Sequence, residues 1–238
     1  DYPEVSSMTL PALHQHRVLV TGGLGALGRA VVATLAERGA QVVALDRAPA
    51  QAIDGARRVL GEVELGDPVA ATLAVDAAVE TLGGLDALVN IAGGFRWETL
   101  LEGSVDTWDA MYQVNVRTAL AATRAALPHL LVPRSAAIVN VGALAANKAG
   151  MGMGAYAASK AGVARFTEAL AEELKDRDVR VNAVLPSILD TPVNRIDMPL
   201  ADTTRWVQPQ DLAAVIAFLL SSDAQAITGA CIPVAGRM

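Results

Sequence analysis

A tyrosine and a lysine four residues apart, Tyr156 and Lys160, are the side chains of this 238-residue sequence whose types and spacing could do chemistry together. On a helix, residues at this spacing lie on one face. An ammonium beside a phenol favours the phenolate and lowers the pKa of the tyrosine from its usual value of about 10. We therefore expect Tyr156 to donate or accept a proton near neutral pH. The same spacing also arises by chance on surface helices, so other residues must complete a site.

Glycines at positions 22, 23, 25 and 28 separate an apolar run, Arg17–Thr21, from a stretch of helical periodicity, Arg29–Arg38. A second apolar run, Gln41–Leu45, ends at Asp46. In a strand–loop–helix–strand unit, such a loop lets backbone and helix N–H groups approach a pyrophosphate. A tight turn without a ligand is the alternative, but Asp46 at the end of the second strand favours nucleotide binding.

The carboxylate of Asp46 also indicates which nucleotide binds. It can accept hydrogen bonds from both hydroxyls of the adenosine ribose and repels a 2′-phosphate, which favours NAD(H). Two cations nearby in the sequence, Arg29 and Arg47, keep NADP(H) open as an alternative.

The elements that must position these residues alternate along the whole chain. Further strands are predicted over residues 58–65, 87–91, 136–141, 180–185 and 230–234, and further helices over residues 68–82, 104–127, 156–174 and 210–220. Ser104 is the predicted N-cap of the helix that runs through Arg117 toward Leu127. The alternation predicts an α/β fold, with a parallel sheet of about seven strands and helices on both faces.

Residues 17–238 are predicted to form one domain, preceded by an N-terminal tail over residues 1–16. Within this tail, Met8 is a candidate for the natural start, with residues 1–7 added before it. The chain has no linker, repeat or low-complexity segment that would divide it.

The composition excludes several classes of function. The chain is 53% hydrophobic with a net charge of −6 and has no basic patch for nucleic acid. No stretch is apolar over the roughly 18 residues of a membrane span. The single Cys231 excludes an intrachain disulfide and predicts a reducing, cytoplasmic setting. The three histidines are too scattered for a metal site.

Several motifs together resemble the short-chain dehydrogenase/reductase superfamily, over the chain from Arg17 to Gly236. The matching motifs are Thr21-Gly-Gly-Leu-Gly-Ala-Leu-Gly28, Asn90-Ile-Ala-Gly-Gly94, Val114-Asn115, Ile138-Val-Asn140, Tyr156-Ala-Ala-Ser-Lys160 and Val181-Asn-Ala-Val-Leu-Pro186. The resemblance implies a Rossmann-type doubly wound sheet in which one domain holds both the NAD(P) cofactor and the substrate.

The resemblance also implies a set of cofactor contacts. These are Gly22, Gly25, Ala26, Leu27, Gly28, Asp46, Arg47, Glu64, Leu65, Asn90, Ala92, Gly93, Tyr156, Lys160, Pro186, Ile188 and Thr191. Glu64 and Leu65 would lie beside the adenine, although a solvated charge at a strand end explains Glu64 equally well. Thr191 would contact the nicotinamide carboxamide, with capping of a following helix as its alternative role.

Two departures from the family pattern are mild: Ala26 replaces a usual loop glycine, and Ile91 a usual asparagine. A third bears on mechanism. The family usually carries a serine thirteen residues before the tyrosine, where this chain has Ala143. Loss of a donor that holds a reacting carbonyl oxygen costs on the order of 10²–10³ in rate. Ser135 precedes the predicted strand 136–141 and lies at its wrong end to substitute.

Alanine at this position is also found in the quinonoid dihydropteridine reductase branch of the superfamily. This chain resembles that branch in Arg17-Val-Leu-Val20, Gly25-Ala-Leu-Gly28, Ala92-Gly-Gly94 and the stretch from Val184 to Arg195, but it retains Asn115. The resemblance implies a quinonoid dihydropterin or a related conjugated ring as substrate, reduced by hydride from the cofactor and a proton from Tyr156.

In this site Lys160 would bind the nicotinamide ribose and tune Tyr156. Asn115 would hold a water or backbone group linked to Lys160 in a proton relay; a bond to its own helix backbone is the alternative. The candidate substrate-pocket residues are Ala143, Phe95, Trp97, Met151 and Met153, although each apolar one, taken singly, is better explained by packing. Gly150, Gly152 and Gly154 would make a substrate-side loop mobile.

Two other functions stay open. One is a general carbonyl or 3-oxoacyl reductase, which Ala143 weakens. The other, of a different class, is a cofactor-binding protein with little turnover, against which Tyr156, Lys160 and Asn115 argue together. The expected partners are a small-molecule substrate and further copies of the chain in a homodimer or homotetramer, because the long helices from Ser104 and Tyr156 resemble those that pair subunits in this superfamily.

Overall fold

Seven parallel strands form a sheet in the order β3-β2-β1-β4-β5-β6-β7. They are β1 (Arg17–Thr21), β2 (Gln41–Leu45), β3 (Ala56–Leu60), β4 (Ala87–Asn90), β5 (Ala136–Val141), β6 (Val179–Pro186) and β7 (Cys231–Val234). The computed structural model describes residues 13–133 and 135–238, so the predicted start at Met8 and the addition over residues 1–7 lie outside the described residues. The predicted α/β fold with its seven-stranded parallel sheet is confirmed.

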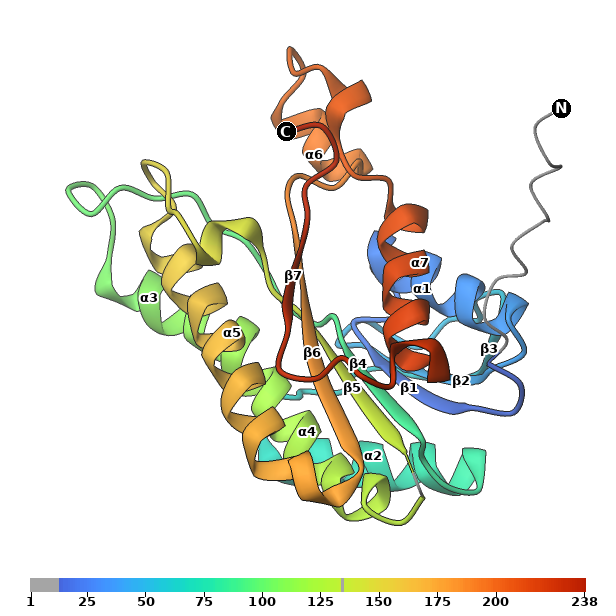
Figure 1. The fold of residues 1–238 in the computed structure, drawn as a ribbon. Coiled ribbons are helices and arrows are strands. Elements are labelled where there is room, and N and C mark those ends of the chain that lie inside the picture. Colours follow the sequence, from blue (N-terminus) through green and yellow to red (C-terminus); the bar gives the residue numbers. More distant parts are fainter. Residues whose placement is uncertain (1–12, 134) are drawn as a thin grey trace, which may run out of the picture.

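Helices cover both faces of this sheet (Figure 1). They are α1 (Ala26–Glu37), α2 (Pro68–Leu82), α3 (Val105–Tyr112), α4 (Thr118–Leu130), α5 (Gly154–Leu174), α6 (Pro192–Asp197) and α7 (Pro209–Leu220). Helices α1 and α7 pack with the sheet in one apolar core. Helices α2, α4 and α5 pack in a second core on the other face. Neighbouring strand residues such as Leu19 and Val20 belong to different cores, because successive side chains point to opposite faces of a sheet.

Local chemistry sets the ends of α2 where the sequence predicts them. The side chain of Asp67 caps the helix by accepting a hydrogen bond from Val69 N (2.9 Å), and Pro68 stands in the first turn. Gly83 ends the helix in the left-handed conformation, with φ +72°. Helix α1 begins at Ala26, three residues before the predicted start at Arg29, so its first turn includes the end of the glycine loop.

The predicted third strand is wrong in its second half. It was expected over residues 58–65, but β3 ends at Leu60 and Glu62 adopts a positive φ of 59°. Val63 and Leu65 are buried beyond this break, so they contribute apolar side chains without continuing the strand.

The predicted long helix from Ser104 is three segments. Ser104 does cap α3, since its Oγ accepts a hydrogen bond from Asp106 N (3.1 Å). Between α3 and α4, residues Gln113–Arg117 form a π-helix, in which each hydrogen bond spans one more residue than in an α-helix. Asn115 lies at the centre of this π-helical turn.

A small lobe stands beyond the carboxyl end of the sheet and contains α6 and the 3₁₀ turn Thr203–Arg205 (Figure 1). Thr191 caps α6, because its Oγ1 accepts a hydrogen bond from Asn194 N (3.2 Å). Within the described ranges 13–133 and 135–238, none of the helices is long and apolar enough to cross a membrane.

Candidate active site

The carboxyl ends of β1 and β4 border a cavity of about 770 Å³. These two strands are neighbours, whereas β2 lies on the other side of β1, so the cavity is at the point where the strand order reverses. Ligands of open parallel sheets bind at such a point. Thr21 joins the two strand ends, because its Oγ1 accepts hydrogen bonds from Ile91 N (3.1 Å) and Ala92 N (3.2 Å).

The glycine loop and the first turn of α1 form one wall of the cavity. A Cβ on Gly28 would overlap the carbonyl oxygen of Gly22, and Gly22 itself has a φ of +68° against Ala92. The N-cap of α1, Gly25, supplies no side-chain cap, and Ala26 and Leu27 at the helix start line the cavity. Helix N–H groups without a side-chain partner, together with the helix dipole, suit a phosphate. This wall therefore fits the pyrophosphate of a dinucleotide.

Asp46 closes the adjoining end of the cavity. Its Oδ2 accepts a hydrogen bond from Leu24 N (2.9 Å) and its Oδ1 one from Ala48 N (3.0 Å). Each carboxylate oxygen has a second lone pair, so both can still accept ribose hydroxyls. Arg47, Glu64 and Leu65 line the same part of the cavity.

Tyr156 and Lys160 stand in the first two turns of α5, beside this cavity. Lys160 is buried, and its Nζ donates a hydrogen bond to Val141 O (2.8 Å) and lies 6.0 Å from the centroid of the Tyr156 ring. Gly93, which lines the cavity, lies against this pair: a Cβ on it would be 3.4 Å from Lys160 Nζ. The fold thus brings a lysine, a phenol and the nucleotide cavity together.

The expected lowering of the Tyr156 pKa is wrong for this structure. Burial raises the pKa of Tyr156 to about 12 and lowers the pKa of Lys160 to about 8. Desolvation disfavours the charged form of each group. The Lys160 ammonium is bonded to Val141 O and not to the phenol oxygen, so burial outweighs the attraction between the two side chains.

Asn115 is buried and uses both ends of its amide. Its Oδ1 accepts a hydrogen bond from Gly94 N (2.9 Å), and its Nδ2 donates to Gly94 O (3.0 Å) and to Ser159 Oγ (3.0 Å). A Cβ on Gly93 would lie 2.6 Å from Asn115 Oδ1. Asn115 therefore ties the loop after β4 to α5, next to Lys160. Bonding to its own helix backbone, the alternative role, is not how its amide is used.

Ala143 follows β5 and is buried, at the start of the 3₁₀ turn Leu144–Ala146, which packs against α5. Ser135 lies at the opposite end of β5. Ser159, also in α5, donates its hydroxyl to Tyr156 O (2.7 Å) and accepts from Asn115. That hydroxyl is thus occupied in joining α5 to the π-helical turn.

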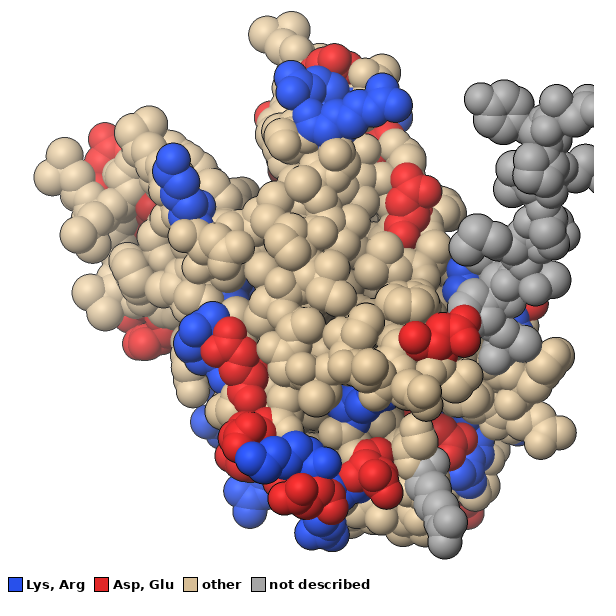
Figure 2. Space-filling model, in the orientation of Figure 1, with Lys and Arg blue, Asp and Glu red and all other residues tan. Residues whose placement is uncertain are grey.

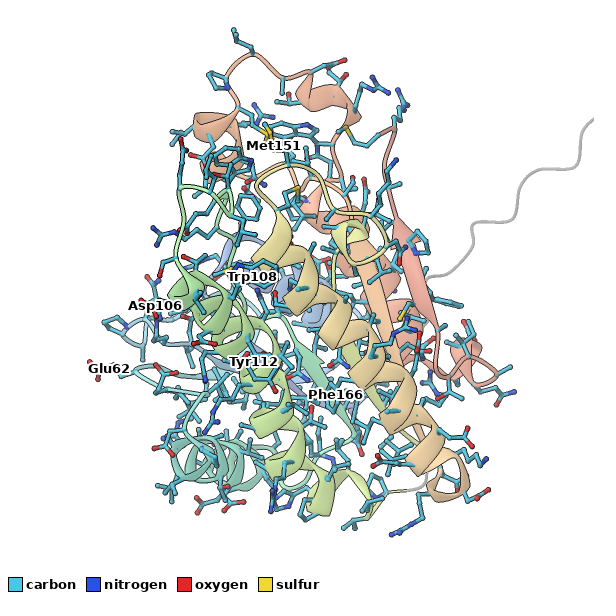
Figure 3. All side chains as sticks on the ribbon, turned by 90° about the vertical axis from the view of Figure 1, so that its left-hand side faces the viewer. Glu62, Asp106, Trp108, Tyr112, Met151 and Phe166 are labelled. Carbon is cyan, nitrogen blue, oxygen red and sulfur yellow. The ribbon has the colours of Figure 1, made fainter. Side chains whose placement is uncertain are left out.

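One aromatic ring packs against Tyr156, and a second lies in the loop that follows this first one. The ring of Phe95 packs edge-on against the Tyr156 ring, with centroids 4.9 Å apart and planes at 84°. Trp97 lies over Gly152, and Met151 is exposed where the loops before α3 and α5 meet (Figure 3). Figure 2 shows an open notch between these loops and the α6 lobe, with mostly uncharged walls.

Two of the three alternating glycines before Tyr156 face tryptophan rings, while the mobility of their loop stays a prediction. A Cβ on Gly152 would overlap the indole of Trp97, and Gly152 has a φ of +73°. A Cβ on Gly154 would lie 3.1 Å from the ring of Trp108. Both glycines allow a tryptophan to approach the backbone closely.

The predicted cofactor residues divide into those that line the cavity and those that do not. The lining ones are Gly22, Gly25, Ala26, Leu27, Gly28, Asp46, Arg47, Glu64, Leu65, Ala92, Gly93 and Thr191. Tyr156 and Lys160 lie beside it, while Pro186 and Ile188 are in the segment at the end of β6 that leads to Thr191. The side chain of Asn90 does not line it, because it donates hydrogen bonds to Thr123 Oγ1 (3.0 Å) and Asn140 Oδ1 (2.9 Å) in the core.

Sequence reasoning missed other lining residues. They are Leu24, Ala48, Gln51, Val63, Ile91, Gln113, Val114, Thr118, Pro192 and Val193. Most flank a motif, and that adjacency was the available signal. Thr118, which directly follows the π-helical turn, had no such signal. Within residues 13–133 and 135–238, no three His, Cys, Asp or Glu side chains gather as metal ligands do.

A doubly wound parallel sheet, a dinucleotide-sized cavity at its switch point and a Tyr–Lys pair beside that cavity define a class, the nicotinamide-dependent α/β oxidoreductases. Residues 16–198 match the family model of short chain dehydrogenases. The chain belongs to this family and is an NAD(P)-dependent short-chain oxidoreductase.

Named relatives span nearly its whole length. The chain is 32% identical to 4-formylbenzenesulfonate dehydrogenase of Comamonas testosteroni, over 94% of this chain and 98% of that protein. It is 31% identical to 3-oxoacyl-[acyl-carrier-protein] reductase of Thermotoga maritima, over 92% and 96%.

Two solved structures are similar to this chain over nearly the whole length of both proteins. A short chain dehydrogenase from Burkholderia cenocepacia in complex with NADP superposes with a TM-score of 0.84 at 35% identity, over 94% of this chain and 98% of that one. The 3-ketoacyl-(acyl-carrier-protein) reductase from Brucella melitensis complexed with NADH has a TM-score of 0.86 at 30% identity, over 95% and 99%.

Proposed function

We propose that this protein transfers a hydride between a nicotinamide dinucleotide, preferentially NAD(H), and a small substrate with a conjugated ring, with Tyr156 as the proton donor. The observation that carries the proposal is the position of Tyr156. Its ring is in edge contact with Phe95, and Lys160 in the same helix lies against the cavity wall at Gly93. A proton donor is thereby held between a nucleotide site and an aromatic surface.

The residues divide the work of the reaction. A bound nicotinamide supplies the hydride. Lys160, fixed by Val141 O, presents a cation at the place where a nicotinamide ribose would pass Gly93. The Tyr156 hydroxyl donates its proton to the substrate atom that gains electron density as hydride arrives. Asn115 holds the loop at Gly94 in place, so the position of the cavity wall relative to Lys160 is fixed.

Asp46 supports the preference for NAD(H). A carboxylate that faces the ribose end of the cavity accepts hydroxyl donors and repels a 2′-phosphate. The similar solved structures hold NADP in one case and NADH in the other, so the preference is our inference from the residue itself.

Ala143 supports a ring substrate. A conjugated ring with several heteroatoms spreads the charge of its reduced form and depends less on a serine hydroxyl than a localised carbonyl oxyanion does. A quinonoid dihydropterin is the most specific candidate for such a substrate. Phe95 and Trp97 beside Tyr156 offer flat apolar surfaces against which a ring can pack.

Carbonyl reduction is the second candidate, and the similarity to a 3-oxoacyl-[acyl-carrier-protein] reductase favours it. The other named relative is a dehydrogenase of 4-formylbenzenesulfonate, which is also a carbonyl compound. On this alternative, restoring a hydroxyl by Ala143→Ser should raise kcat with carbonyl substrates by about tenfold or more. No gain would count against a carbonyl substrate.

The decisive experiment measures NADH oxidation with quinonoid dihydropterin, aromatic aldehydes and 3-oxoacyl substrates. Turnover of the dihydropterin that Tyr156→Phe reduces by about 10²-fold or more, with NADH binding retained, supports the proposal. Turnover of carbonyl compounds alone would replace it with the second candidate. Tight NADH binding without turnover of any substrate would instead identify a cofactor-binding protein.

We also propose that the protein works as a homodimer or homotetramer. The support is an exposed aromatic surface on α3, with Tyr112 49% and Trp108 41% exposed (Figure 3). Surfaces of this kind mark protein contacts.

A further inference from the structure

Two loops meet on the substrate side of Tyr156, and the contact between them depends on a tryptophan and a glycine. The indole of Trp97 lies so close to Gly152 that a Cβ there would overlap it. The next residue continues the contact, because Glu98 N donates a hydrogen bond to Gly152 O (2.8 Å). Trp97 is nevertheless 53% exposed, so part of its side chain is accessible to another molecule.

The carboxylate of Glu98 holds this contact from the other side. Its Oε1 accepts a hydrogen bond from Ser104 N (2.6 Å), and its Oε2 accepts one from the hydroxyl of Thr107. The guanidinium of Arg96 lies 3.3 Å from the same carboxylate. The hydrogen bonds from Thr107 and Ser104 and the ion pair with Arg96 hold the pKa of Glu98 below its usual value, so the carboxylate stays ionised. Glu98 thereby attaches the loop to the first turn of α3.

Gly103 leaves room for the Glu98 carboxylate because it has no side chain. A Cβ on Gly103 would overlap Glu98 Oε1 and lie 2.5 Å from its Cγ. Residues 95–98 are therefore bonded at one side to α3 and at the other to Gly152, four residues before Tyr156. Phe95, at the start of this segment, is the residue in edge contact with Tyr156.

We propose that Trp97 is a specificity-determining residue, and that Glu98 is the positioning residue that holds it against Gly152. The indole then sets how wide a ring can lie beside Phe95 and reach Tyr156. The proposal rests on the proposed function for its turnover consequences, but the contact between Glu98, Trp97 and Gly152 can be tested without turnover.

The structural test uses fluorine NMR of the whole protein labelled with fluorotryptophan. The chain has three tryptophans, and the Trp97 resonance is assigned by its loss in Trp97→Phe. Glu98→Ala should shift or broaden the Trp97 resonance and leave that of buried Trp206 in place. Glu98→Gln keeps a hydrogen-bonding group at both ends and should restore the parent spectrum. Glu102→Ala, in the same loop, is the matched control and should change nothing.

The functional test compares kcat/KM for quinonoid dihydropterin and for its wider 6-phenyl derivative, with NADH as reductant. Trp97→Ala should raise the ratio of the 6-phenyl derivative to the parent pterin by about tenfold, the size of discrimination that pocket shape supplies. Glu98→Ala should move the ratio in the same direction, with Glu98→Gln and Glu102→Ala close to the parent. The Kd of NADH should be the same in all variants, because none of these residues lines the nucleotide cavity.

The outcomes separate the two proposals. An unmoved Trp97 resonance in Glu98→Ala overturns the positioning role, whatever the activity. An unchanged substrate ratio in Trp97→Ala overturns the specificity role. If every variant binds NADH and none reduces either pterin, the proposed pterin turnover and the specificity role both fail, while the NMR result still decides whether Glu98 holds Trp97.

Discussion

At the scale of single residues, burial decides the protonation of the Tyr–Lys pair. Both groups lie where their charged forms lose solvation, and the amine is bonded to a carbonyl oxygen. The site thus holds a neutral phenol beside an ammonium whose pKa of about 8 is close to neutral pH. The proposed donor, Tyr156, is therefore protonated at neutral pH, as a general acid must be before it gives up its proton.

Lys160→Met tests the cost of this buried charge. The folded-state pKa of Lys160, about 8, lies below its ordinary value of 10.5, so the charge is present in both states below pH 8 and its full desolvation cost applies there. Methionine removes that cost but leaves Val141 O without its donor. We expect a net gain in the free energy of unfolding on the order of 2 kcal/mol at neutral pH, with activity lost.

The stability gain of Lys160→Met should depend on pH. As pH rises through the interval from about 8 to 10.5, the folded state binds fewer protons than the unfolded state, so the parent gains stability and the advantage of Lys160→Met shrinks. Urea unfolding of both proteins across this interval measures it. An advantage that grows with pH would contradict the buried-charge account.

Asp46→Asn tests the choice of nucleotide. The amide removes the negative charge that repels a 2′-phosphate, so the ratio of the NADPH Kd to the NADH Kd should fall by about tenfold. Asparagine has one acceptor oxygen where aspartate has two, so either Leu24 N or Ala48 N loses its partner and both affinities should weaken. Fluorescence titration with the two reduced cofactors gives the ratio, and a constant ratio would assign the preference to another residue.

At the scale of elements, two breaks in regular structure build the site. The π-helical turn at Gln113–Arg117 directs Asn115 to the loop at Gly94. The sharp glycine loop before α1 brings the helix start onto the cavity. π-Helical turns are rare and frequent at functional sites, in keeping with this position.

A matched pair of substitutions tests the glycine loop. In Gly28→Ala the new methyl group would overlap the carbonyl oxygen of Gly22, whereas in Gly25→Ala it would lie 3.5 Å from the same oxygen, an ordinary contact. Gly28→Ala should therefore weaken NADH binding by about tenfold or more and lower the Tm, since strain of this kind costs about 1–3 kcal/mol. Gly25→Ala should keep the Tm of the parent, because its methyl group makes only an ordinary contact within the protein. Calorimetric titration and thermal unfolding distinguish the two, and equal losses would show that the loop tolerates no side chain at either position.

At the scale of the whole molecule, the sheet separates two apolar cores, and the candidate active site lies at the carboxyl end of the sheet. The face of α3 and α5 away from the sheet exposes aromatic residues, among them Trp108 and Tyr112 (Figure 3). The substrate-side loops adjoin this face, because Trp108 packs on Gly154 at the start of α5. Association of two copies through this face of α3 and α5 would therefore place the partner next to the substrate-side loops.

Tyr112→Glu tests this surface as the contact between copies. A buried charge in each copy of a symmetric interface is costly, so light scattering should show a smaller species than the parent. Val132→Glu places the same charge at an exposed position beyond α4 and should leave the assembly unchanged. An unaltered mass in Tyr112→Glu would exclude this face.

The sequence alone determined the features that neighbouring residues encode. The caps Asp67 and Ser104, the glycine at position 83 and the period of the apolar residues fix where elements begin and end, because capping bonds and periodicity are local. The alternation of these elements predicted the parallel sheet. In a parallel sheet the carboxyl ends of the strands lie at one edge, so the glycine loop after β1 and the loop at Gly93 after β4 lie at the same edge.

Only the tertiary structure decided what depends on burial and on contacts between distant segments. The sequence could not show that the Asn90 side chain turns into the core, that Gly152 serves Trp97, or that desolvation outweighs Lys160 in setting the pKa of Tyr156. It located the Tyr–Lys pair and the cofactor wall beside it. The packing around them fixed their charge and their neighbours, because solvation and close contact belong to the folded chain as a whole.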